Sequence, residues 1–281
     1  MCGIIAAAAN QNIGNLLIDG LHKMEYRGYD SAGIAIIDEN QDISFLRSLG
    51  KVSLLEEKIN NQKLEGHVGI AHTRWATHGE PSEQNAHPHF SSDKVYIVHN
   101  GIIENHLEMT EFLKTKGYEF TSQTDSELIA HLLDFHSAPK QSFIHTMQKA
   151  IKELDGAFAI AAIEHSNAKS VYLARNKSPL LIGIGDGMML AASDPLALGG
   201  ILNKFIFLED GDVAKITKEK YKIFDKNNKD IEREIKEINI TQEALSKGEF
   251  KHYMEKEIYE QPQALINTLD GRISGEDVLD N

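Results

Sequence analysis

The single cysteine of this sequence, Cys2, lies directly after the initiator methionine and is its most reactive side chain. A residue as small as cysteine usually permits removal of Met1. The chain would then begin with a residue that carries both a thiol and a free α-amine. An α-amine has a pKa of about 7.7–8.0 and can take up the thiol proton, and a thiolate is a strong nucleophile. The other interpretation is structural, because an unpaired cysteine is often a small buried residue at the start of a strand.

Other polar residues that could do chemistry gather between positions 72 and 127. Residues 72–81 (HTRWATHGEP) contain the only tryptophan, and Asn100-Gly101 follows the apolar run at 95–98. Asn-Gly is also the strongest local turn signal, so this pair has a purely structural interpretation. The same holds for residues 124–127 (TDSE), which match a helix capping box with an acid in the first turn.

The composition narrows the classes of function. The chain has 281 residues, of which 41% are hydrophobic and 25% charged, as in ordinary globular proteins. A net charge of −13 argues against a nucleic-acid partner and against an anionic membrane surface. One cysteine allows no intramolecular disulfide, which fits the cytoplasm. The apolar run at 4–9 follows no positive residue and is too short to span a membrane, so it predicts a buried strand.

The apolar pattern predicts strands first, then helices, then strands again. The early strands are expected at 2–9, 32–38, 42–49, 67–73 and 95–98, with helices at 12–25 and 54–59 and a long polar loop at 74–93. Helices follow at 105–116, 125–136 and 141–154, and then strands at 157–163, 171–174, 180–184, 188–191, 205–208, 213–216 and 221–224. This order indicates an α+β fold, in which two antiparallel sheets pack face to face between outer helices.

Turn residues divide the predicted strands into hairpins. Polar or glycine-containing turns are expected at 38–41, 185–187 and 226–229. Asp194-Pro195 has the pattern of a cap followed by the first residue of a short helix. The character changes after residue 240, because 241–270 is polar and helix-like and 271–281 is acidic with few apolar residues. This last part therefore indicates a linker that is frayed at its end.

Five stretches, taken in order, resemble the class II glutamine amidotransferases, which are N-terminal-nucleophile hydrolases. They are residues 2–4 (CGI), 26–33 (YRGYDSAG), 74–81 (RWATHGEP), 99–101 (HNG) and 124–125 (TD). Residues 252–262 and 268–272 are similar to the junction in the glutamine–fructose-6-phosphate aminotransferases. The resemblance covers essentially the whole chain. It implies a four-layer αββα sandwich, with a glutaminase domain at 1–240 and a linker at 241–281 toward a sugar-isomerase half that is absent from this chain.

The resemblance also implies a reaction. L-glutamine would be hydrolysed to glutamate and ammonia through a thioester on Cys2, with no metal or organic cofactor, in a monomer. The ammonia would serve the synthesis of glucosamine 6-phosphate from fructose 6-phosphate in the enzyme's own sugar-isomerase domains. Two alternatives remain: the glutaminase half of a phosphoribosyl-type amidotransferase, and a non-catalytic ammonia-channel scaffold. A zinc hydrolase is disfavoured, because the many histidines have no carboxylate or thiolate at a diagnostic spacing.

Glutamine presents an α-carboxylate, an α-ammonium and a carboxamide, and the resemblance assigns a partner to each. Arg74 would hold the carboxylate, because a guanidinium matches it in two parallel hydrogen bonds. Asp125 would hold the ammonium. The side-chain amide of Asn100 and the backbone N–H of Gly101 would stabilise the oxyanion of the tetrahedral intermediate. The structural alternative for Arg74 is a surface ion pair.

The remaining site residues surround the nucleophile or belong to a loop. Arg27 resembles the arginine beside the nucleophile, where a cation favours the thiolate and lowers the pKa of the amine. Its alternative role is a bridge that holds the loop at 27–33. Trp75, Thr77 and His78 would contact substrate, and residues 74–81 would form a lid that excludes water. A further histidine, His87, is expected to be structural.

Overall fold

The computed structural model describes residues 2–240, 248–269, 273–274 and 277–278. The chain divides into two compact units, Met1–Ile240 and Thr241–Asn281. In the described part of the first unit, all strands pair antiparallel and form two large sheets. This arrangement confirms the predicted α+β fold.

The first sheet is built around the amino-terminal strand. Its strand order is β15-β11-β9-β10-β1-β4-β2-β3. The strands are β1 (Gly3–Ala9), β2 (Ser31–Ile37), β3 (Ile43–Leu49), β4 (Val68–Arg74), β9 (Leu181–Gly185), β10 (Met188–Ala192), β11 (Lys204–Phe207) and β15 (Ile235–Glu237). The apolar run after Cys2 is thus a buried central strand, as its composition predicts.

The second sheet has the strand order β14-β13-β12-β8-β7-β6-β5. Its strands are β5 (His89–Ser91), β6 (Val95–Ile103), β7 (Gly156–Glu164), β8 (Val171–Asn176), β12 (Val213–Ile216), β13 (Tyr221–Phe224) and β14 (Asp230–Ile231). β6 and β7 form its longest pairing, with Asn100 opposite Ala159 and Gly101 opposite Phe158.

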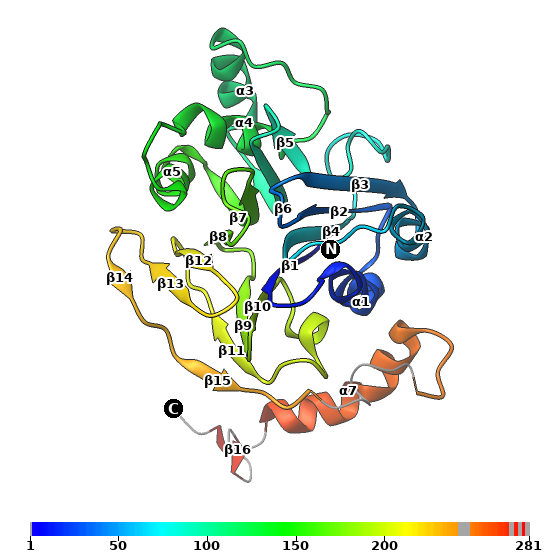
Figure 1. The fold of residues 1–281 in the computed structure, drawn as a ribbon. Helices are drawn as coiled ribbons and strands as arrows, with labels where there is room; N and C mark the ends of the chain where they lie inside the picture. Colours follow the sequence, from blue (N-terminus) through cyan, green and yellow to red (C-terminus); the bar gives the residue numbers. More distant parts are fainter. Residues whose placement is uncertain (1, 241–247, 270–272, 275–276, 279–281) are drawn as a thin grey trace. The chain divides into compact units, whose positions relative to one another are not determined.

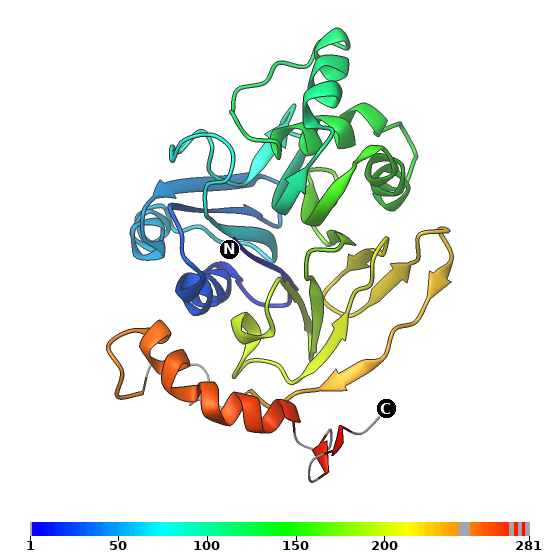
Figure 2. The same cartoon turned by 180° about the vertical axis from the view of Figure 1, so that it is seen from behind.

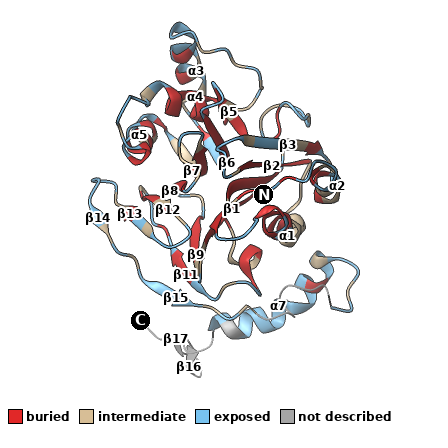
Figure 3. Ribbon diagram, in the orientation of Figure 1, coloured by how far each residue is buried: buried red, intermediate tan, exposed pale blue. Residues whose placement is uncertain are grey.

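Helices cover the outer face of each sheet, which completes the expected four layers (Figures 1 and 2). The helices α1 (Gly14–Met24) and α2 (Val52–Gln62), with the 3-10 helix η3 (Pro195–Leu198), share a core with the first sheet. The helices α3 (His106–Thr115), α4 (Glu127–His136) and α5 (Phe143–Ala150) share a second core with the other sheet. A third core fills the space between the two sheets, and the central strands β1, β2 and β4 are buried along their whole length (Figure 3).

The core between the sheets explains how three polar residues come together. It takes alternate residues of three strands, namely Ile4, Ala6 and Ala8 of β1, Val68 and Ile70 of β4, and Tyr96 and Val98 of β6. Successive side chains of a strand point to opposite faces. Cys2, His72 and Asn100 are the next residues in these alternations, so each side chain continues a buried row. The apolar pattern thereby brings a thiol, an imidazole and an amide to one end of the sandwich.

Several element boundaries differ from those predicted. The short β5 lies inside the expected loop at 74–93, and β14 and β15 extend the sheets beyond the last predicted strand. The helix expected at 54–59 is longer, because α2 spans Val52–Gln62. The helix expected at 141–154 is α5 followed by the 3-10 helix η2 (Ile151–Glu153). The strands β5, β14 and β15 have only two or three residues each, which is too short for an alternating apolar pattern to reveal them.

The second unit contains the helix α7 (Tyr253–Leu269), which has Pro262 in its interior. This helix matches most of the helix-like stretch expected at 241–270, and residues 241–247 and 270 lie outside the described residues. Within the stretch expected to be frayed, β16 (Ile273–Ser274) and β17 (Asp277–Val278) form a short antiparallel pair. No helix among the described residues is both long and apolar enough to cross a membrane.

Candidate active site

All nine residues predicted for the site line one cavity of about 380 Å³. They come from distant parts of the chain: Cys2, Arg27, Arg74, Trp75, Thr77, His78, Asn100, Gly101 and Asp125. Ser178 and Pro179, from the connection between β8 and β9, also line this cavity and were not predicted. A larger cavity of about 550 Å³ lies at the opposite end of β1, around Ala8 and Asn10, and contains none of the predicted residues.

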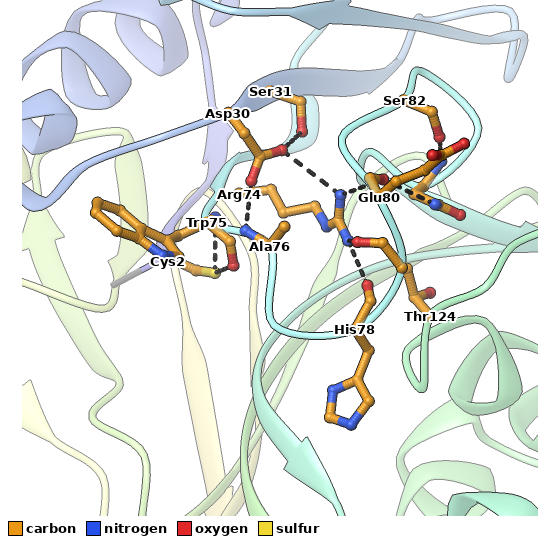
Figure 4. A network of polar contacts seen from close by, with 12 residues as sticks. Cys2, Asp30, Ser31, Arg74, Trp75, Ala76, His78, Glu80, Ser82 and Thr124 are labelled. Carbon is orange, nitrogen blue, oxygen red and sulfur yellow. Dashed lines mark hydrogen bonds and ion pairs between the residues drawn. The ribbon is translucent and has the colours of Figure 1, made fainter.

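Cys2 lies beside the backbone of Trp75 (Figure 4). Its Sγ accepts a hydrogen bond from the Trp75 N–H at 3.2 Å and lies 3.5 Å from the Trp75 carbonyl oxygen. Burial raises the pKa of the Cys2 thiol, and the Trp75 hydrogen bond offsets part of that rise. The thiol therefore stays protonated at neutral pH, and a nucleophilic reaction requires a base that takes up its proton.

Asn100 and Gly101 lie within strand β6, so the turn interpretation of this pair is wrong. Gly101 has φ +133°, and a Cβ added there would lie 1.9 Å from the carbonyl oxygen of Ala157. Only glycine fits this backbone, because other residues rarely adopt such a φ and the space is closed. The Asn100 amide donates from Nδ2 to the Cys2 carbonyl oxygen at 3.3 Å. The structure thus places this amide directly beside the candidate nucleophile.

Arg74 is only 4% exposed, which excludes the surface ion pair considered for it. Its guanidinium lies 3.5 Å from Asp30 Oδ1 and donates to the carbonyl oxygens of His78, Gly79 and Glu80 (Figure 4). Asp30 also accepts a hydrogen bond from the backbone N–H of Ala76. One buried ion pair therefore fixes the 74–81 loop in its present position.

Asp125 is 5% exposed and faces the cavity from the segment before α4. Its Oδ2 accepts from the Ile103 N–H at 2.8 Å and its Oδ1 accepts from Ser126 Oγ at 3.3 Å. A buried carboxylate with neutral donors and an open side toward a cavity is suited to a cationic ligand.

The predicted capping box does not form. Helix α4 begins at Glu127, and its N-cap Ser126 makes no side-chain capping hydrogen bond. Glu127 instead accepts hydrogen bonds from the N–H groups of Thr121 at 2.9 Å and Ser122 at 2.6 Å. The side chain of Thr124 is 3.1 Å from His89 Nε2. These longer-range partners replace the local cap, which the sequence pattern alone could not indicate.

Arg27 lies at the cavity wall, and its ion pair with Asp194 runs to the segment before η3 rather than within the loop at 27–33. It lines the cavity with Cys2, and its Nη1 donates to Asp194 Oδ2 at 3.1 Å. Asp194 also accepts from Tyr26 Oη at 2.7 Å and caps η3 through the Leu196 N–H at 2.9 Å, as the Asp-Pro pattern predicts. A bridge to η3 therefore holds this cation at the cavity wall.

The loop residues differ in exposure. Trp75 is 52% exposed, and its ring lies so close to Gly28 that a Cβ added there would approach it to 1.7 Å. Thr77 and His78 line the cavity, although the His78 ring points away from Arg74 and packs edge-on against His106 (Figure 4).

A group of buried histidines lies at the cavity, whose lining includes His87 and His99. The His87 ring lies between that of His72, 4.0 Å away and tilted by 33°, and that of His89, 4.6 Å away and edge-on. Its Nδ1 accepts from the His99 N–H at 3.3 Å, in keeping with the structural role expected of it. Burial lowers the pKa of His87 well below its usual value. Among the described residues, no group of three or more His, Cys, Asp or Glu side chains could hold a metal ion.

Comparison with known proteins identifies the domain. Residues 72–199 match the glutamine amidotransferase domain family. The chain carries a glutamine amidotransferase domain. It is 50% identical over 279 residues to the glutamine–fructose-6-phosphate aminotransferase (isomerizing) of Haemophilus influenzae, covering 99% of this chain and 46% of that protein. The corresponding enzyme of Vibrio parahaemolyticus is 48% identical over the same coverage. The chain thus spans about half the length of the curated relatives it matches.

Solved structures show the same fold at lower identity. The glutamine phosphoribosylpyrophosphate amidotransferase of B. subtilis superimposes on this amidotransferase domain with a TM-score of 0.68 at 22% identity, covering 79% of this chain and 48% of that one. A class II glutamine aminotransferase domain protein from Silicibacter pomeroyi gives a TM-score of 0.56 at 15% identity, covering 80% of this chain and 99% of that one. The chain therefore shares the fold of these solved structures.

Proposed function

We propose that this amidotransferase domain hydrolyses L-glutamine to glutamate and ammonia, with Cys2 as the nucleophile after removal of Met1. The observation that supports this most is the single cavity that brings together a thiol, an amide donor, two arginines and a buried carboxylate. Among them, Arg74 suits the α-carboxylate of glutamine and Asp125 the α-ammonium, while the Cys2 thiol and the Asn100 amide suit the carboxamide. The alternative cavity around Ala8 offers no thiol.

The reaction begins with transfer of the thiol proton. The α-amine of Cys2 accepts the proton, directly or through one water, and the thiolate attacks the carboxamide carbon. The second N–H of the Asn100 amide and the N–H of Gly101 donate to the oxyanion that forms. The protonated amine then returns its proton to the leaving nitrogen, which departs as ammonia. Water cleaves the γ-glutamyl thioester, which releases glutamate and restores the thiol.

Binding of glutamine requires a change in the 74–81 loop. In this structure the Arg74 guanidinium donates to loop carbonyl oxygens, so a substrate carboxylate would replace one or more of them. Asp125 keeps an open side for the α-ammonium. Trp75, Thr77 and His78 then close over the bound substrate and exclude water.

The high identity to glutamine–fructose-6-phosphate aminotransferases supports a wider role. In a longer chain, the ammonia would pass to sugar-isomerase domains and aminate fructose 6-phosphate to give glucosamine 6-phosphate in the cytoplasm. The identity of 45–50% to this enzyme favours it over a phosphoribosyl-type amidotransferase, whose solved structure is 22% identical. The similarity to the phosphoribosyl-type structure, at 22% identity, supports the fold alone.

Glutamate release from L-glutamine tests the proposal directly. The protein, shown by intact mass to begin at Cys2, is compared with Cys2→Ala, which removes only the sulfur. We expect hydrolysis by the first protein and none above background by the second. Hydrolysis by Cys2→Ala would contradict the role of Cys2 as nucleophile. No hydrolysis by the processed chain would contradict the proposed activity and favour the non-catalytic scaffold.

A further inference from the structure

We propose that His72 is a positioning residue that fixes the orientation of the Asn100 amide, so that its N–H groups face Cys2 and the cavity. This inference rests on the proposed function, because it concerns the same oxyanion donor. His72 is fully buried in β4 and is not among the residues that line the cavity. Any effect on the reaction must therefore pass through a neighbour.

The hydrogen bonds of His72 define its tautomer. Its Nε2 lies 3.0 Å from the carbonyl oxygen of His99 and 2.9 Å from Oδ1 of Asn100. A backbone carbonyl oxygen can only accept, so Nε2 must carry the hydrogen. The buried Nδ1 has no partner among the described residues, and a bare lone pair is the less costly group to leave there. Burial also lowers the pKa of His72 to about 3, so the ring remains neutral.

This tautomer selects one orientation of the Asn100 amide. With Oδ1 toward His72, the imidazole N–H meets an acceptor, and Nδ2 donates to the Cys2 carbonyl oxygen. With the amide turned over, two donors would face each other at His72 and two acceptors would face each other at Cys2. The observed orientation is therefore the only one in which both contacts are satisfied.

The packing around His72 keeps the imidazole in place. Its ring packs against that of His87 at a centroid distance of 4.0 Å, with the two planes tilted by 33°. His87 is in turn held by the backbone N–H of His99, whose carbonyl oxygen is the other acceptor of His72. A closed set of contacts thus links β4, the segment before β5 and strand β6 behind the oxyanion donor. Such support is what a catalytic hydrogen-bond donor needs to be preorganised.

The test compares three variants for glutamine hydrolysis. His72→Phe removes the donor but keeps a flat ring, and we expect kcat to fall about 100- to 1,000-fold, as when an oxyanion donor is lost, with KM changed less than about threefold. His72→Gln can place an N–H near the position of Nε2, and we expect it to recover kcat to within about tenfold of the unaltered protein. His131→Phe is the control, because His131 is also buried, at 7% exposed, but contacts Ser91 and Glu127, which do not line the cavity.

A double variant separates positioning from general damage to the fold. If His72 acts through the amide, then His72→Phe combined with Asn100→Ala should cost no more in kcat than Asn100→Ala alone. A fold-loss in kcat of the double variant that equals the product of the losses of the two single variants would overturn the proposal. So would a His72→Phe protein with unchanged kcat, or a His131→Phe protein with an equal loss.

A measurement on the unaltered protein does not depend on whether variants fold. The 15N and 1H chemical shifts of the His72 ring, assigned through bonds from its own backbone amide, should show a neutral ring protonated at Nε2 from pH 5 to 9. A ring protonated at Nδ1, or one that titrates in this range, would overturn the proposal. If the unaltered protein fails to hydrolyse glutamine at all, the proposed function fails first, whereas an active enzyme with the wrong tautomer refutes only the role of His72.

Discussion

At the scale of single residues, burial of the nucleophile decides what else the site must contain. Because burial raises the pKa of the Cys2 thiol, little thiolate exists before substrate binds. An α-amine on the same residue would supply the missing base without a second side chain. The cavity holds Arg27 and Arg74 as cations, yet each already binds a carboxylate, Asp194 or Asp30. These ion pairs therefore weaken the electrostatic effect of the two arginines on the Cys2 thiol.

Asp125→Asn tests recognition of the substrate ammonium. The Asn side chain keeps an oxygen that can accept from the Ile103 N–H, so the fold should be retained. The charge is lost, and a hydrogen bond to a charged group contributes about 1.5–3 kcal/mol. We therefore expect KM for glutamine to rise about 10- to 100-fold, with kcat within a few-fold of the unaltered protein. Steady-state kinetics with Asp186→Asn, in the exposed turn after β9, provides the control.

An unchanged KM in Asp125→Asn would contradict the assignment of Asp125 to the ammonium. Asp125→Asn could instead lower kcat, raise KM and lower the urea midpoint of unfolding together. That result would show that Asp125 supports strand β6 through Ile103.

At the scale of elements, strand β6 has an unusual backbone conformation at Gly101, where it lines the cavity and packs closely against β7. Gly101→Ala would introduce a residue at φ +133° and place its Cβ against the carbonyl oxygen of Ala157. Backbone strain and overpacking each cost about 1–3 kcal/mol, so we expect a loss of about 3 kcal/mol in unfolding free energy, and loss of hydrolysis. Gly117→Ala is a matched control, because Gly117 also has a positive φ of +91° but open space around it.

Urea unfolding of both glycine variants checks this prediction. Gly117→Ala should cost only about 1–2 kcal/mol and leave hydrolysis unchanged. Equal losses in the two proteins would show that the positive φ alone, and not the contact between β6 and β7, sets the cost.

Glu127 ties the start of α4 to the loop before it. Burial raises its pKa, but hydrogen bonds from His131, Thr121 and Ser122 outweigh burial and hold the pKa well below its usual value. A carboxylate with a lowered pKa stabilises the fold above its unfolded pKa, and this contribution is lost as the pH falls toward the folded value. Glu127→Gln should therefore lower the unfolding free energy at pH 7 by about 1.5–3 kcal/mol.

The difference between Glu127→Gln and the unaltered protein should shrink as the pH falls below about 4.5, close to the ordinary pKa of a glutamate. Urea unfolding at pH 7 and pH 4 measures it, with Glu111→Gln as the control, because Glu111 makes only an exposed pair with Lys114. A difference that does not depend on pH would show that the charge of Glu127 contributes nothing.

The sequence predicted long elements well and local polar motifs poorly. The apolar runs of β1, β4 and β6 could be recognised in the sequence because each strand contributes a continuous row of side chains to the core. Asn100-Gly101 reads locally as a turn, yet pairing with β7 holds it in a strand. Residues 124–127 match a capping box, yet Glu127 accepts hydrogen bonds from the N–H groups of Thr121 and Ser122 instead. A pairing between distant strands overrides the local preference in the first case, and hydrogen bonds from five and six residues earlier in the chain do so in the second.

At the scale of the whole molecule, the resemblance to the amidotransferases grouped site residues that no local rule could group. Nine residues spread from position 2 to 125 meet in one cavity. The role of His72 could not be derived in this way, because it depends on which atom of Asn100 faces the imidazole. A histidine in the alternating row of β4 was the available signal, since a polar residue in a buried row needs a partner.

The contacts within Met1–Ile240 predict that this unit folds by itself. The three core clusters of buried residues lie among positions 4–223. A chain ending at Ile240 should therefore unfold in urea with the same midpoint as the 281-residue chain and retain glutamine hydrolysis. Loss of the cooperative transition would show that Thr241–Asn281 is part of the folding unit.

The central claim is that Cys2 at the chain terminus attacks glutamine, and intact mass with a diazoketone analogue of glutamine tests it most directly. We expect a mass that lacks Met1 and gains one analogue adduct, located on Cys2 by peptide mapping, with excess glutamine slowing the labelling. A chain that begins at Cys2 and takes up no analogue would contradict the account.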